Sequence, residues 1–110
     1  KDGKDNNNRE ATPQAWDVID LLRTMADEKG CSVSQLALAW CAAQPGVTAP
    51  IIGPRTFEQV ADNLGAVNVR LDTADFERID AMVPPRSVTV RYYDRAIAVD
   101  FRPHRHRSVI

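Results

Sequence analysis

The part of this sequence best suited to chemistry is the turn Gly53-Pro54-Arg55-Thr56, which joins an apolar run to the start of a helix. Backbone amides at a helix N-terminus lack intrahelical acceptors and lie at the positive end of the helix dipole, so an anion is stabilised there. Arg55 adds a permanently charged, planar guanidinium that can pair with a phosphate through two hydrogen bonds. Thr56 offers a hydroxyl beside the same amides. The turn therefore predicts a phosphate-binding site.

Polar residues on the following helix extend this predicted site. Gln59 and Asn63 are four residues apart and share one helix face, and Asp62 precedes Asn63. Asp62 can accept a hydrogen bond from an exocyclic amine. A simpler interpretation is that Thr56 and Gln59 only cap the helix, that Arg55 is a solvated loop residue, and that Asn63 serves a local turn. The ordered combination of these residues favours binding.

Four helices are predicted to position the site. They are expected over residues 13–29, from the capping box of Ser32 and Gln35 to Pro45-Gly46, from Thr56 through Val67, and from Asp72 to Pro84. The second helix is apolar on every face and must be covered on more than one side. The expected buried stripe of the third helix comprises Phe57, Val60, Ala61, Leu64 and Val67. Trp16 and Trp40 are expected to pack in the core or between helices.

One strand is predicted between the second and third helices, over residues 47–52. This short apolar run is typical of strands buried on both faces, which indicates an α/β fold. A single strand leaves its backbone donors and acceptors unpaired, so we expect its partners to come from residues outside this sequence. The chain also begins with Lys1 rather than Met, which favours further residues upstream. In eight-stranded α/β barrels, the loops after the last strands often bind phosphate.

Composition excludes several classes of protein. The 110 residues are 44% hydrophobic and carry a formal net charge of −1, which argues against a nucleic-acid or membrane partner. No long apolar run or secretion signal is present, so a cytoplasmic protein is expected. Cys31 and Cys41 have no histidine at metal-binding spacing, so no metal site is predicted. Six arginines and two aspartates make residues 86–110 a basic tail.

The sequence resembles the C-terminal part of an aldo-keto reductase between about Trp16 and Pro85. The segments that carry the resemblance are Leu36-Ala37-Leu38-Ala39-Trp40, residues 44–56, Glu58-Gln59 and Asp62-Asn63-Leu64. The resemblance implies the C-terminal segment of a (β/α)8 TIM barrel, with the last strand and its flanking helices, incomplete as a domain on its own. It also implies a polar lead-in at 1–10, barrel sequence at 11–85 and a C-terminal extension at 86–110.

The resemblance further implies a parent enzyme that reduces aldehydes and ketones with NADPH. Its cofactor motif falls on Gly53, Pro54, Arg55 and Thr56 for the adenosine 2′-phosphate, and on Gln59, Asp62 and Asn63 for the adenosine. Some members have Lys where Gly53 stands, so Arg55 alone would serve the 2′-phosphate here. The family's catalytic Asp, Tyr, Lys and His lie on earlier strands that this sequence does not contain. No catalytic residue is therefore assigned, and the isolated 110 residues are expected to be inactive.

Two alternatives remain open at this point. The chain could be a non-catalytic remnant that binds nucleotide, or a small helical binding module whose basic tail contacts a partner. In the reductase interpretation the partners are the nicotinamide cofactor and a small carbonyl substrate. The identity of that substrate and the oligomeric state are not predicted by this sequence, because substrate pockets are shaped by loops after other strands.

Overall fold

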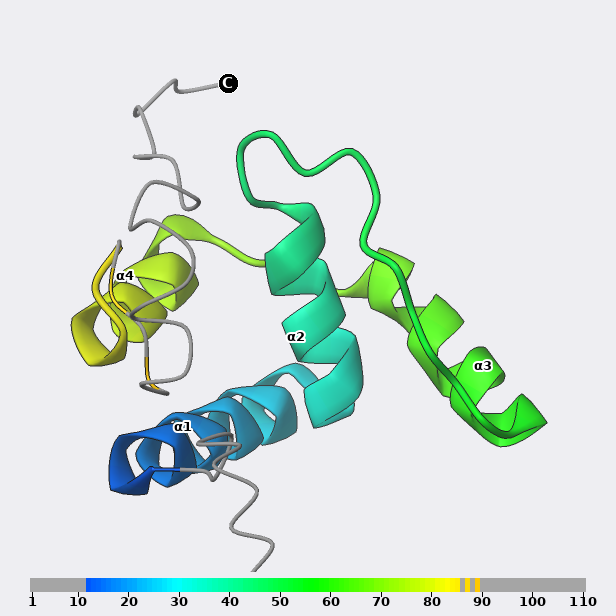
Figure 1. Ribbon diagram of the computed structural model, residues 1–110, viewed down its shortest axis with the longest axis horizontal. Helices are drawn as coiled ribbons and strands as arrows, with labels where there is room; N and C mark the ends of the chain where they lie inside the picture. The colour runs from blue at the N-terminus through cyan, green and yellow to red at the C-terminus, as the bar shows by residue number, and fades with distance from the viewer. Residues whose placement is uncertain (1–11, 86, 88, 90–110) are drawn as a thin grey trace, which may run out of the picture.

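The computed structural model describes residues 12–85, 87 and 89, and within them the chain forms helices joined by irregular segments (Figure 1). The elements are α1 (Pro13–Lys29), α2 (Val33–Ala42), α3 (Phe57–Leu64), the 3₁₀ helix η1 (Gly65–Asn68) and α4 (Thr73–Met82). Helix α2 contacts α1, α3 and η1, whereas α4 contacts α1. The predicted lead-in and all but two residues of the basic tail lie outside the described residues. None of the described helices is long and apolar enough to cross a lipid bilayer.

The predicted helix starts are confirmed. Helix α1 begins after Thr12, whose side chain accepts a hydrogen bond from the Ala15 amide, and ends at Gly30 in the left-handed conformation with φ 65°. Helix α2 begins with the capping box of Ser32 and Gln35. The same arrangement starts α3 and α4. Local side-chain chemistry therefore sets where each helix begins.

The core lies where α1, α2 and α4 meet. Its buried apolar residues are Met25, Ala26, Leu36 and Ile79. Trp40 is half-buried and packs against this cluster, as predicted. Trp16 was predicted to pack as well, but its side chain is 54% exposed. This core buries little apolar surface for the part of the chain that the structure describes.

The predicted strand at residues 47–52 is not formed in the structure. These residues belong to an irregular connection that arches from the end of α2 and then runs beside α3 to its start (Figure 1). Ile51 is 99% exposed, the opposite of a residue in a buried strand. A strand needs a neighbour to accept and donate its backbone hydrogen bonds, and no described segment provides one.

The predicted buried stripe of the third helix is also wrong for the described structure. Phe57, Leu64 and Val67 are exposed by 84%, 60% and 74%, Ala61 is exposed, and Val60 is half-buried. The prediction failed because α3 contacts only α2 and η1 among the described elements, and these leave Phe57 and Leu64 uncovered. An apolar stripe predicts that a helix face will be covered, but it does not supply the covering element.

Two ion pairs join the end of α1 to α4. Lys29 Nζ lies 2.6 Å from Asp75 Oδ2, and the Arg78 guanidinium holds both carboxylate oxygens of Glu28. Asp75 is buried, which by itself raises the pKa of its carboxyl group. The Lys29 ammonium and the Asp72 amide outweigh burial, so this pKa lies below its ordinary value of 3.8. The hydrogen bond to Asp75 raises the pKa of Lys29 above 10.5.

We expect Lys29→Met to destabilise the packing of α4 on α1 by about 1 to 2 kcal/mol, because it leaves the buried Asp75 carboxylate without its cation. The contribution of Asp75 is present above pH 3.8 and is lost as the pH falls through the lowered pKa. The contribution of Lys29 is present below pH 10.5 and is lost as the pH rises through the raised pKa. Hydrogen-exchange protection of α1 and α4 amides at neutral pH measures the effect.

The matched control is Arg23→Met, which removes the exposed ion pair between Arg23 and Asp20. Exposed pairs contribute little, so exchange in this variant should match the unmodified chain. Equal loss of protection in both variants would show that the Lys29 pair has no special role.

Candidate binding groove

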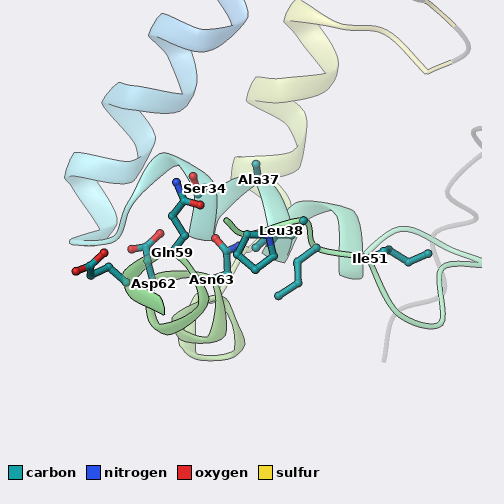
Figure 2. Close-up of a pocket in the computed structure, with 11 residues that line it drawn as sticks. Ser34, Ala37, Leu38, Ile51, Gln59, Asp62 and Asn63 are labelled. Atoms are coloured by element: carbon teal, nitrogen blue, oxygen red, sulfur yellow. The ribbon is translucent and has the colours of Figure 1, made fainter. Parts of the chain in front are cut away.

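A groove of about 640 Å³ lies between α2, α3 and the connection that precedes α3 (Figure 2). Its lining residues are Ser34, Ala37, Leu38, Ile51, Ile52, Gly53, Pro54, Glu58, Gln59, Asp62 and Asn63. Helix α2 supplies a largely apolar wall and α3 supplies a polar wall, with the apolar Ile51 beside them (Figure 2). This division suits a ligand that combines a flat apolar ring with polar groups at its edge.

The structure brings five of the seven predicted site residues together in this groove. They are Gly53, Pro54, Gln59, Asp62 and Asn63. Arg55 and Thr56 follow directly in the chain but do not line the groove. Arg55 is exposed and forms no ion pair with any described residue. Its guanidinium is therefore available to an anion outside the chain.

The amides at the start of α3 are less open than the sequence indicates. The Gln59 side-chain oxygen Oε1 accepts from the Arg55 amide at 2.7 Å and from the Thr56 amide at 3.3 Å. In return, the Gln59 amide donates to Thr56 Oγ1 at 3.2 Å. The capping function considered for Thr56 and Gln59 is thus present. Within the described part of the chain, the amides of Phe57 and Glu58 remain without an acceptor.

Asp62 is attached to α2 at two points. Its carboxylate oxygen Oδ2 accepts from Ser32 Oγ at 2.8 Å, and its backbone carbonyl accepts from Gln35 Nε2 at 2.8 Å. The sequence indicated Ser32 and Gln35 only as a capping box. Their contact with residue 62 spans about thirty positions and has no local sequence signal.

The α2 wall of the groove was not predicted. Ser34, Ala37 and Leu38 lie on one helix face because they are three and four residues apart. Ser34 is the polar member of this face, and its place beside the apolar run that begins at Leu36 was the sequence signal that could have identified it. The pattern of α2, apolar nearly all round, did not reveal which side would meet α3.

The described cysteines and acidic residues form neither a disulfide nor a metal cluster. Cys31 and Cys41 are free thiols, and burial raises the pKa of Cys31, which disfavours its nucleophilic thiolate. No group of three or more His, Cys, Asp or Glu side chains in the described ranges is placed to hold a metal ion. The tail residues Tyr92, Tyr93, His104 and His106 lie outside the described part of the chain.

The chain is similar in sequence to a known family and to a bacterial oxidoreductase. The profile of the Aldo/keto reductase family matches residues 1–84. An uncharacterized oxidoreductase of Bacillus subtilis strain 168, YrpG, is 42% identical over 66 residues, which is 60% of this chain and 20% of that protein. The chain therefore spans about a fifth of the length of this curated relative. Because the family match covers residues 1–84, the chain belongs to the aldo/keto reductase family.

Proposed function

We propose that this chain is the cofactor-binding C-terminal part of an NADPH-dependent aldo-keto reductase of the cytoplasm. The observation that carries the proposal is that Gly53, Pro54, Gln59, Asp62 and Asn63 line one groove. The family match supports a nicotinamide cofactor. The types of residue in the groove support its adenosine half as the part that binds there. The proposal has three further parts: the cofactor is NADPH rather than NADH, the chain forms only the last part of a barrel, and the protein is cytoplasmic.

The residues of the groove fit the adenosine half of the cofactor. Ala37 and Leu38 offer an apolar surface on which a purine ring can lie. Asp62 can accept from the purine amine, and Asn63 can donate and accept at the ring edge. Arg55, which forms no ion pair with any described residue, offers its guanidinium to the 2′-phosphate, together with the Phe57 amide.

In this proposal the chain holds one end of the cofactor and does not perform the reaction. When bound, the nicotinamide supplies hydride for reduction of a small aldehyde or ketone. The proton donor and its activating residues lie in a part of the protein outside these 110 residues. Binding energy from the adenosine end serves the reaction by fixing the position of the distant nicotinamide ring.

We expect Arg55→Ala in the full-length protein to weaken NADPH binding by about 1.5 to 3 kcal/mol, the range for hydrogen bonds to charged groups. NADH lacks the 2′-phosphate, so its affinity should be unchanged. Calorimetric titration of both dinucleotides measures the two effects separately. The preference for NADPH over NADH should therefore fall by roughly tenfold or more.

The control for this experiment is Arg70→Ala, because Arg70 is an exposed arginine that does not line the groove. It removes the same charge and should leave both affinities unchanged. If Arg55→Ala also leaves the NADPH affinity unchanged, Arg55 is not part of the site. If both variants weaken NADPH equally, the effect is one of net charge and not of a specific contact.

A second prediction concerns the 110 residues expressed alone. Because Ile51 and Phe57 are almost fully exposed and the core is small, we expect helical circular dichroism but a broad, non-cooperative thermal transition. NADPH oxidation with a carbonyl substrate should be undetectable. A sharp unfolding transition of a monomer would contradict the idea that other sequence completes the fold.

The alternative functions make a different prediction for the upstream reading frame. A reductase requires strand and helix repeats with Asp, Tyr, Lys and His at strand ends before this segment. A nucleotide-binding remnant or a binding module does not require them. Sequencing upstream of Lys1 distinguishes these possibilities.

A further inference from the structure

The capping box of α2 does more than start a helix. Ser32 and Gln35, its two members, both reach out of α2 to residue 62 of α3. One holds the carboxylate and the other holds the backbone carbonyl. Both the position and the rotation of the Asp62 side chain are therefore set by the first turn of another helix.

The Ser32 hydroxyl has a single orientation in this arrangement. Its oxygen accepts from the backbone amide of Gln35 at 3.1 Å, so the hydroxyl hydrogen is directed away from that amide. The hydrogen is donated to Asp62 Oδ2 at 2.8 Å. The other oxygen, Oδ1, accepts from no described residue. The hydrogen bond thus engages one carboxylate oxygen of Asp62, a residue that lines the groove, and leaves the second oxygen without a partner among the described residues.

Gly65 provides the space that Gln35 needs. Gly65 has φ −61°, an ordinary helical value that any residue adopts, so backbone freedom does not explain the glycine. A Cβ at this position would overlap Gln35 Nε2, the atom that donates to the Asp62 carbonyl. Alanine at position 65 would therefore displace the Gln35 side chain and break its contact with residue 62.

We infer that Ser32 is a positioning residue for purine recognition and acts through Asp62, with Gln35 and Gly65 holding residue 62 in place. The inference rests on the proposed function, in which Asp62 accepts from the adenine amine. A fixed carboxylate distinguishes a 6-aminopurine from a 6-oxopurine, because the amine donates a hydrogen bond whereas the oxo group presents lone pairs to the carboxylate. A carboxylate free to rotate loses much of this discrimination.

The test compares two dinucleotides in the full-length protein: NADPH and its hypoxanthine analogue, which carries an oxo group in place of the adenine amine. We expect Ser32→Ala to weaken NADPH about threefold to tenfold and to leave the hypoxanthine analogue unchanged. Ser32→Thr keeps the hydroxyl and should restore the NADPH affinity. Ser32→Gly should behave like Ser32→Ala, and because glycine is well tolerated at a helix N-cap it serves if Ser32→Ala does not fold.

Two further variants separate positioning from general stability. Asp72→Ala removes the capping box of α4, which resembles that of α2 but does not contact residue 62. It should leave the affinities for both dinucleotides unchanged. Gly65→Ala leaves Ser32 intact and should show the same selective loss for NADPH as Ser32→Ala.

The outcomes test the positioning role of Ser32 separately from the proposed binding of NADPH. If the unmodified protein does not bind NADPH, the proposed function is wrong and the inference falls with it. If it binds both dinucleotides equally, NADPH binding stands but Asp62 does not recognise the amine, and the inference is overturned. It is also overturned if Ser32→Ala weakens both dinucleotides equally or neither, because a purely structural role gives the first result and no role gives the second.

Discussion

The hydrogen bonds from the start of α2 to residue 62 decide where α3 lies, and the groove depends on them. Among the described elements, α3 contacts only α2 and η1, and most of its apolar residues are exposed, with only Val60 half-buried. Burial of an apolar face, which usually holds a helix in place, therefore contributes little to the position of α3. Directional contacts from Ser32 and Gln35 take its place. The two walls of the groove face each other because of those contacts.

The two sides of α2 differ in how well their apolar side chains are buried. On one side of α2, the buried Met25 and Ile79 and the Lys29–Asp75 pair hold α1 and α4 together. On the other side, which carries the groove, Ile51 and Phe57 are exposed. Membership of a family built as α/β barrels fits this asymmetry, since a sheet would cover such residues. The half that carries the groove is thus the half whose large apolar side chains are left exposed in the described structure.

The start of α3 shows how a helix cap and an anion site use the same groups. The Gln59 side chain takes the Arg55 and Thr56 amides, which a phosphate could otherwise have bound. The Phe57 and Glu58 amides and the Arg55 side chain have no partner among the described residues, so they remain available to an anion. Because Gln59 occupies two of the amides, the proposed phosphate site depends more on the Arg55 side chain than it would at a helix start with all its amides open.

The sequence by itself determined the helix starts, the family and five of the eleven groove residues, because each rests on local chemistry. A cap such as Ser32 or Asp72 acts within three residues, and Gln59 and Asn63 share a face through helical spacing alone. Only the tertiary structure decided that residues 47–52 form no strand, that Phe57 is uncovered, and that Asp62 is held from α2. These features depend on which distant segments are present as neighbours, and no local pattern encodes that.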